Sequence, residues 1–290
     1  MQIILVSGLS GAGKSTALRI LEDSGYYCID NLPLSMLEQL AQIYQQYGYN
    51  NIAVGVDIKT SPLLHQLPQL IKALRENGID TRLIYLDANN TSLLTRFSET
   101  RRKHPLTTAT RTIEESIDLE RDLLAEIAML SHRIDTSHLS ANDLRKLVKE
   151  FVKADFNQLN IIIQSFGFKY HLPIDSDFVF DVRCLPNPHY DKNIRDFNGT
   201  QEPIIEFLDK EPSVQNMLGD IYNMLSRWFD EFSRDNRNYL TVSIGCTGGK
   251  HRSVYLTEKL SQLVRRNFPY NVITRHRQLL KQETNTPKEK

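Results

Sequence analysis

The sequence has few cysteines and no long apolar run. Its three cysteines, Cys28, Cys184 and Cys246, lie far apart and form no C-x-x-C pair. Neither a disulfide framework nor a zinc site is therefore expected. No apolar stretch approaches the roughly 20 residues of a membrane-spanning helix. A secretory signal is not expected either, because the apolar run before Ser7 is short and has no basic region ahead of it. We expect a cytoplasmic protein with no membrane partner.

The chain also has no net charge, but its two signs are unevenly placed. Lys and Arg number 35, as do Asp and Glu. From Gly245 onward there are ten Lys or Arg against three Glu, a net of +7, so the residues before carry −7. This asymmetry indicates an anionic partner at the C-terminal end. The length of 290 residues predicts about two domains.

The stretch Gly8 to Ser15, G-L-S-G-A-G-K-S, has the features of a phosphate-binding loop. It follows the apolar run 3–6 and precedes a helical pattern, which is the required strand, loop and helix context. The glycines allow successive N–H groups to surround an anion at a helix N-terminus. Lys14 would reach the β- and γ-phosphates, and the Ser15 hydroxyl would hold Mg²⁺. The predicted nucleotide contacts are Gly8, Leu9, Ser10, Gly11, Ala12, Gly13, Lys14 and Ser15.

The first half alternates short apolar runs with helical patterns. Strands are expected near 26–30, 52–56, 83–87 and 133–136, with helices at 36–44, 67–74, 91–102, 112–132 and 140–152. Such alternation predicts an α/β fold, here a P-loop kinase-like parallel sheet with helices on both faces. We place this nucleotide-binding domain at residues 1–154.

Three of these strands end in an aspartate, Asp30, Asp57 or Asp87. Ligands of parallel sheets bind at the carboxyl ends of the strands, so each could orient Mg²⁺, and Asp57 and Asp87 are favoured. The alternative is a helix cap or a turn.

A basic cluster follows: Arg96, Arg101, Arg102, Lys103 and His104. It could be the arginine lid of a small-molecule or nucleotide kinase, or the solvated end of a helix.

The second half, 155–290, restarts the pattern and predicts a smaller α/β domain. Strands are expected at 161–168, 178–183 and 239–244, with helices at 203–210 and 214–234. The last strand enters a second glycine-rich loop, G-C-T-G-G-K-H-R-S from Gly245 to Ser253, followed by a helix. This arrangement is a second anion cradle.

The same loop contains Cys-x5-Arg-Ser, the pattern of cysteine-dependent phosphatases, in Cys246, Arg252 and Ser253. Three interpretations stay open: phosphate binding, catalysis and a structural turn. Gly245, where such enzymes often carry histidine, and the lack of a general acid weigh against catalysis.

A basic segment without acidic residues runs from Arg265 to Lys281. Its predicted RNA contacts are Arg265, Arg266, Arg275, His276, Arg277 and Lys281. The segment suits an RNA backbone, because no helix that would read a DNA groove is evident. The alternative is a solvated tail.

Six motifs together resemble the RapZ family of RNase adapter proteins. They are G-L-S-G-A-G-K-S, Y-Y-C-I-D-N-L-P, S-F-G-F-K, F-D-V-R-C-L-P-N-P-H, I-G-C-T-G-G-K-H-R-S and T-R-H-R, spread over essentially the whole chain. The resemblance implies a homotetrameric adapter that binds ATP and GTP with at most weak hydrolysis. In enteric relatives the adapter presents a small regulatory RNA to the endoribonuclease RNase E, which lowers synthesis of glucosamine-6-phosphate synthase.

The resemblance also assigns residues. The second nucleotide stretch matches Asp57, Ile58, Lys59 and Thr60. A glucosamine-6-phosphate site matches Lys169, Asp181, His189, Cys246, Thr247, Gly248, Gly249 and Arg252. This chain differs from enteric relatives at its end, because residues 282–290 include two glutamates where those relatives carry a compact Lys/Arg cluster.

Overall fold

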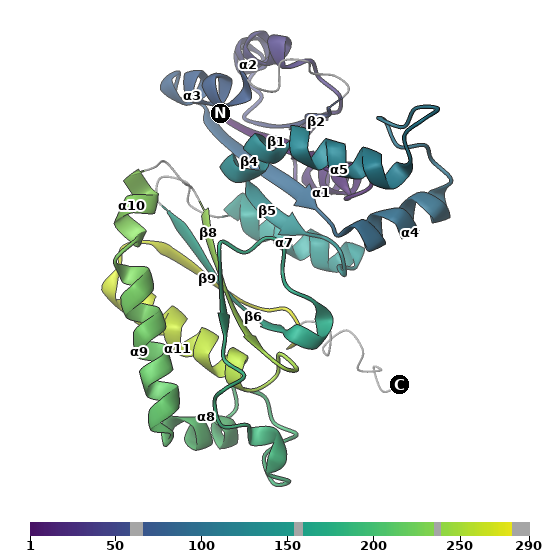
Figure 1. The fold of residues 1–290 in the computed structure, drawn as a ribbon. Coiled ribbons are helices and arrows are strands. Elements are labelled where there is room, and N and C mark those ends of the chain that lie inside the picture. The colour runs from purple at the N-terminus through teal and green to yellow at the C-terminus, as the bar shows by residue number, and fades with distance from the viewer. Residues whose placement is uncertain (59–65, 154–158, 235–238, 280–290) are drawn as a thin grey trace, which may run out of the picture. The chain divides into compact units, whose positions relative to one another are not determined.

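A computed structural model describes residues 1–58, 66–153, 159–234 and 239–279. The chain divides into two compact units, Met1–Phe156 and Asn157–Lys290. Each unit is built around its own parallel sheet, and each is described by itself below (Figure 1).

The N-terminal unit alternates strands and helices, as its sequence pattern predicts. Its strands are β1 (Gln2–Gly8), β2 (Tyr27–Ile29), β3 (Asn51–Gly55), β4 (Asp80–Asp87) and β5 (His132–Asp135). Its helices are α1 (Lys14–Glu22), α2 (Leu37–Gln46), α3 (Leu67–Glu76), α4 (Asn90–Thr100), α5 (Ile113–Leu123), α6 (Ala125–Leu130) and α7 (Ala141–Lys153). The strands lie in the order β2-β3-β1-β4-β5, and every pairing is parallel.

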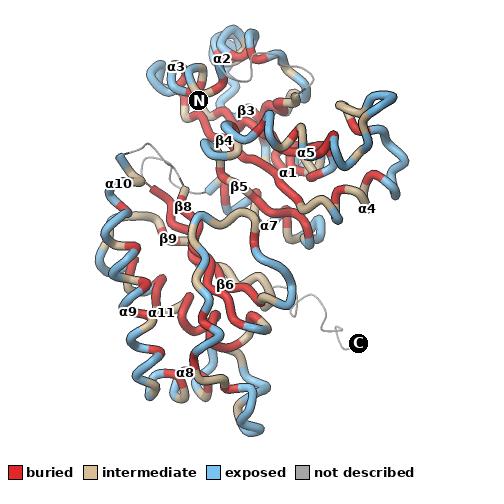
Figure 2. The backbone as a smooth tube through the Cα atoms, in the orientation of Figure 1, coloured by how far each residue is buried: buried red, intermediate tan, exposed pale blue. Residues whose placement is uncertain are grey.

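The central strand β1 shows why this sheet forms. Ile3, Ile4, Leu5 and Val6 are all fully buried, as expected for a strand covered on both faces. In Figure 2 the strands of this sheet are drawn largely in the red of buried residues. Helix α1 packs against α7, whereas α3 packs against α6 and β4. Figure 1 shows helices on both sides of the sheet, so the predicted α/β class is confirmed.

The C-terminal unit is a second parallel α/β structure, which confirms the predicted fold class. Its strands are β6 (Asn160–Gly167), β7 (Phe178–Asp181), β8 (Tyr239–Cys246) and β9 (Asn271–His276), in the order β7-β8-β6-β9. Its helices are α8 (Glu202–Asp209), α9 (Pro212–Ser226), α10 (Phe229–Arg234) and α11 (Arg252–Asn267). Helix α11 packs on β6, β8 and β9 and also contacts α8 and α9. The central strand β6 is buried along its whole length.

Two helices are shorter than the sequence predicts. The helix expected at 112–132 is two helices, because Leu124 leaves the helical dihedral region at φ −98° and ψ 3°. The capping box that was expected at its start is present between Thr112 and Glu115. The helix expected at 214–234 likewise divides into α9 and α10.

Strand β9 was missed, because its sequence, N-V-I-T-R-H, was interpreted from its charge as part of a basic tail. It pairs in parallel with β6, from Asn160 opposite Asn271 to Ser165 opposite His276. It lies at an edge of the sheet, where half-exposed basic side chains are tolerated. The solvated-tail alternative is therefore wrong for residues 271–276. Within the described parts of the chain, no helix has the length and apolarity needed to cross a membrane.

Candidate nucleotide and phosphate sites

The loop Gly8–Ser15 connects β1 to α1 at the carboxyl edge of the first sheet. Gly8 has φ +141°, and a Cβ there would lie 2.2 Å from the carbonyl oxygen of Leu86 on the neighbouring strand β4. Gly13 has φ +107° directly before α1. Both positions thus require glycine, the first because of a close backbone approach and the second because of its left-handed conformation.

Two side chains from later elements hold this loop. The Thr136 hydroxyl lies 2.9 Å from the carbonyl oxygen of Ala12 and 3.0 Å from that of Asp87, and its one hydrogen is shared between these two acceptors. The Arg96 guanidinium donates to the carbonyl of Gly11 at 3.1 Å and also bonds Thr136. Arg96, which the sequence offered as a lid residue, therefore supports the loop from α4.

Lys14 and Asp57, two of the predicted nucleotide contacts, lie close together. The Lys14 ammonium donates to the carbonyl of Gly8 at 2.6 Å and lies 3.8 Å from the Asp57 carboxylate. Ser15 is exposed in the first turn of α1. Ser15 and Asp57 fit the magnesium of a bound nucleotide, because such an ion takes most of its ligands from phosphates and water. Among the described residues no group of three His, Cys, Asp or Glu could hold a metal by itself.

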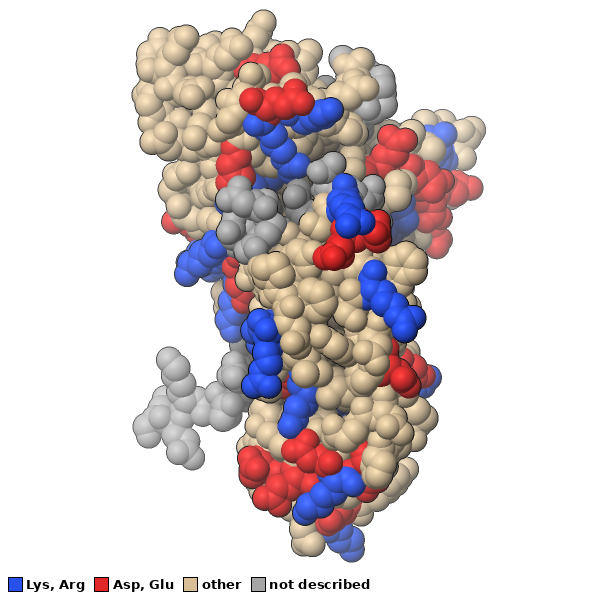
Figure 3. All heavy atoms as spheres, turned by 90° about the vertical axis from the view of Figure 1, so that its left-hand side faces the viewer, with Lys and Arg blue, Asp and Glu red and all other residues tan. Residues whose placement is uncertain are grey.

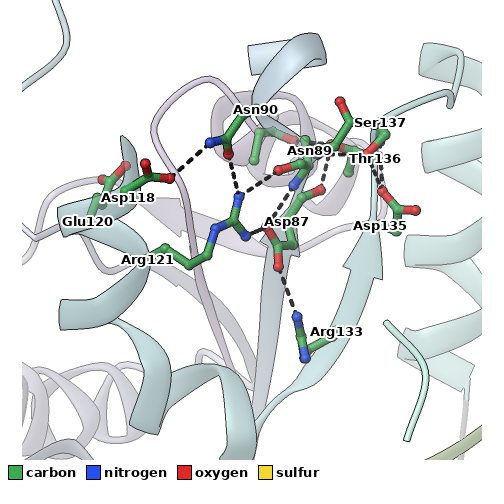
Figure 4. Close-up of polar contacts among 12 residues, drawn as sticks. Asp87, Asn89, Asn90, Asp118, Glu120, Arg121, Arg133, Asp135, Thr136 and Ser137 are labelled. Atoms are coloured by element: carbon green, nitrogen blue, oxygen red, sulfur yellow. Dashed lines mark hydrogen bonds and ion pairs between the residues drawn. The ribbon is translucent and has the colours of Figure 1, made fainter. Parts of the chain in front are cut away.

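Asp87, the other favoured magnesium ligand, is engaged elsewhere. Its carboxylate oxygens accept from Arg121, at 2.6 Å, and from Arg133, at 2.9 Å, and its side chain is 2% exposed (Figure 4). Arg121 also donates to Asn90, which in turn donates to Asp118. Both Asp87 oxygens are thus used in a structural network, and the geometry favours Asp57 as the acid beside the phosphates.

A buried carboxylate from α5 contacts the loop. Glu120 accepts from the Ser10 backbone N–H and from its hydroxyl, each at 2.8 Å. The His104 ring lies 3.0 Å from the same carboxylate, and both side chains are fully buried. Burial by itself would raise the pKa of Glu120, but the hydrogen bond from His104, the nearby Lys14 charge and the two bonds from Ser10 outweigh it and hold the pKa below its ordinary value.

The other predicted residues of this unit are less involved. Ile58 is half-buried beside Asp57, whereas Lys59 and Thr60 lie outside the described residues. Arg101, Arg102 and Lys103 are exposed after α4, and His104 is buried rather than at a solvated helix end.

The second loop, 247–251, connects β8 to α11 at the carboxyl edge of the second sheet. The Lys169 backbone N–H, just after β6, donates to the carbonyl of Thr247 at 3.2 Å. A Cβ on Gly167 would lie 2.6 Å from the carbonyl carbon of Gly248, so the end of β6 and the loop touch through their backbones. Gly249 has φ +67°, which favours glycine.

Arg252, at the start of α11, is almost fully buried. Its Nη1 donates to the carbonyls of Arg183, at 2.8 Å, and Leu185, at 2.9 Å. Its buried Nε–H has no hydrogen-bond partner in the described structure. A buried donor without a partner is costly, and an anion is the partner that best suits a guanidinium.

The residues of the Cys-x5-Arg-Ser pattern have surroundings that do not favour phosphatase catalysis. Cys246 is 3% exposed, and its sulfur lies 3.1 Å from the Ser253 hydroxyl. A Cβ on Gly245 would lie 2.4 Å from the ring of Phe166 and 2.6 Å from that of Phe168. Histidine would not fit at Gly245, which gives a physical reason for the departure from such enzymes.

The remaining predicted sugar-phosphate residues lie on neighbouring segments of the same edge. Asp181 ends β7 and pairs with Arg183, whose hydrogen bond lowers the pKa of this carboxyl. The His189 ring lies 6.5 Å from that of His251, a residue of the loop that the sequence did not single out as a ligand. Burial lowers the pKa of His251, which also bonds the carbonyl of Arg195.

The predicted RNA contacts occupy the end of α11 and the edge strand β9. Arg266 is exposed, whereas Arg265 donates to Thr274 and to the carbonyl of Val272. His276 lies 2.8 Å from Glu258, and Arg277 lies 3.4 Å from Asp175. Arg275 is half-buried on β9, and Lys281 lies outside the described residues. On the face in Figure 3, basic and acidic side chains are interspersed.

Two family models match the chain and together cover nearly all of it. The RapZ-like N-terminal domain matches residues 1–156, and the RapZ C-terminal domain matches residues 159–280. The chain belongs to the RapZ family. This confirms the resemblance of the six motifs.

Close relatives of this RapZ family member carry a general name. A "Nucleotide-binding protein" of Chromobacterium violaceum is 51% identical over 282 residues, which are 97% of this chain and 100% of that protein. A "Nucleotide-binding protein" of Thiobacillus denitrificans is 50% identical over 279 residues, 96% of this chain and 100% of that protein.

Two solved structures match about half of the chain. A sugar kinase from Janibacter sp. has a TM-score of 0.39 and 16% identity, covering 52% of this chain and 94% of its own. Shikimate kinase from Bacteroides thetaiotaomicron has a TM-score of 0.38 and 10% identity. The match covers 52% of this chain and 98% of the shikimate kinase chain.

Proposed function

We propose that this protein is a nucleotide-binding RNA adapter. In this proposal it presents a small regulatory RNA to RNase E, controls synthesis of glucosamine-6-phosphate synthase and senses glucosamine-6-phosphate in its C-terminal unit. It acts in the cytoplasm as a homotetramer that binds ATP or GTP with Mg²⁺. Membership of the RapZ family and the names of the relatives support the proposal.

The observation that carries the proposal is that each unit holds a glycine-rich loop between a strand and a helix. Both loops lie at the carboxyl edge of a parallel sheet, where ligands bind. In the first, Lys14 and Asp57 supply the charges for a magnesium nucleotide. In the second, the buried Arg252 offers a donor to a phosphate.

The sensing part is tested by Arg252→Gln. We expect glucosamine-6-phosphate to bind about tenfold more weakly, because a charge-assisted hydrogen bond to phosphate contributes about 1.5–3 kcal/mol. Titration calorimetry measures the affinity. Arg227→Gln, at an exposed position directly after α9, is the matched control. Unchanged affinity in a folded Arg252→Gln protein would exclude this residue as the phosphate ligand.

The proposed RNA binding is tested by the salt dependence of the affinity for RNA. If about five basic residues contact phosphates of a single strand, the log–log slope of affinity against salt is roughly −3.5. Arg266→Ala, which removes an exposed charge at the end of α11, should make the slope shallower by about 0.7. Lys210→Ala, exposed after α8, should leave it unchanged. Gel-shift titration at several salt concentrations gives the slopes, and a flat dependence would contradict RNA-backbone binding.

A further inference from the structure

The contact between α5 and the first loop brings a negative charge to a site for anions. Glu120 and Ser10 are 110 residues apart in sequence, yet the carboxylate accepts two hydrogen bonds from this residue of the loop. In Figure 4 no dashed line joins Glu120 to the other residues drawn. Glu120 therefore belongs to the loop and not to that network.

The histidine beside Glu120 does not cancel its charge. The Leu106 backbone N–H donates to His104 Nδ1 at 3.2 Å, so Nδ1 is an acceptor and Nε2 carries the proton that faces Glu120. His104 is thus a neutral donor that orients the carboxylate. Of the neighbouring elements, α1 supplies Lys14 and β4 supplies the Tyr85 phenol, and both interact electrostatically with Glu120.

The Lys14 charge interacts electrostatically with Glu120, and an incoming ligand would draw on the same ammonium. In a phosphate-binding loop this ammonium moves to the β- and γ-phosphates. Glu120 then faces added negative charge in a buried setting, where electrostatic interactions are stronger than in water. The repulsion increases with the charge of the terminal phosphates, so it is larger for a triphosphate than for a diphosphate.

We propose that Glu120 is a specificity-determining residue that shifts the preference of this site from nucleoside triphosphates toward nucleoside diphosphates. The inference rests on the proposed nucleotide binding at Gly8–Ser15. His104 and Ser10 act as positioning residues that hold the carboxylate beside the loop.

Glu120→Gln isolates the charge. The amide oxygen can accept from the Ser10 N–H and from His104, and the amide NH₂ can donate to the Ser10 hydroxyl, which rotates to accept. All three contacts thus persist while the charge is removed. We expect the ratio of the dissociation constants, ATP over ADP, to fall about tenfold at fixed free Mg²⁺ and neutral pH.

The matched control is Glu114→Gln, which removes an exposed charge from the same helix and should leave the ratio unchanged. A purely structural role would change both affinities together and not their ratio. If Glu120→Gln does not fold, the double variant His104→Leu and Glu120→Leu, which replaces the buried pair by apolar side chains, should lower the ratio equally.

Two failures are distinguishable. If the wild-type protein binds ADP and ATP but a folded neutral variant keeps the wild-type ratio, the role of Glu120 is overturned and nucleotide binding stands. If the wild-type protein binds neither nucleotide, the proposed nucleotide binding itself is overturned.

Discussion

Lys14→Ala should weaken ATP binding by at least about 100-fold, because two charge-assisted hydrogen bonds to phosphate contribute about 3–6 kcal/mol together. The ammonium donates to the Gly8 carbonyl and lies 3.8 Å from the Asp57 carboxylate. Without it, the phosphates would face Asp57 and Glu120 without the positive charge of Lys14. Titration calorimetry with ATP and with GTP measures the loss.

The same variant tests whether the two units act separately. RNA binding should persist in Lys14→Ala, because the predicted RNA contacts lie in the C-terminal unit. Lys72→Ala, which removes an exposed lysine from α3, is the control for a general charge effect. If a folded Lys14→Ala protein lost RNA binding as well, the first loop would have a direct part in RNA recognition and the proposal would need revision.

Asp87→Ala is expected to lower the free energy of unfolding of the N-terminal unit by about 3 kcal/mol. The substitution removes the acceptor of Arg121 and Arg133 and leaves both guanidinium groups beside a buried cavity. Asp118→Ala, which removes an exposed carboxylate joined to the same network through Asn90, should change the value by less than about 0.5 kcal/mol.

The single tryptophan separates this effect from the other unit. Trp228 lies in the C-terminal unit, so its fluorescence follows the unfolding of that unit, while far-ultraviolet circular dichroism follows both. In urea, Asp87→Ala should lower the midpoint of unfolding of the N-terminal unit, seen by circular dichroism, and leave the midpoint seen by Trp228 fluorescence unchanged. A parallel shift of the tryptophan transition would show that the two units unfold together.

Local sequence signals predicted the scaffold well. The apolar run before Gly8 and the glycines after it were enough to predict β1, the loop and α1, because strand, loop and helix are adjacent in sequence. The same holds for β8, the second loop and α11. Both α/β sheets followed from alternating patterns.

Contacts between distant segments could not be predicted in this way. Glu120 sits in the middle of an ordinary helical pattern, and only the fold brings it to Ser10. Arg96 is similar, because its cluster of basic neighbours resembled a lid while its guanidinium supports Gly11. Asp57 and Asp87 were both favoured as magnesium ligands from the sequence. Only the ion pairs of Asp87 with Arg121 and Arg133 show that its carboxylate is already engaged. In each case the partner lies on another strand or helix.

The position of β9 has a consequence for how the chain is made. Among the described residues it is the last strand in sequence, and it pairs with β6, the first strand described in its unit. The second sheet therefore cannot be completed until the ribosome has released nearly the whole chain, whereas the strands and helices of the first unit are synthesised well before. A chain truncated before Asn271 would leave the buried strand β6 at the edge of its sheet, with backbone N–H and C=O groups unpaired. Such an edge is a template for aggregation.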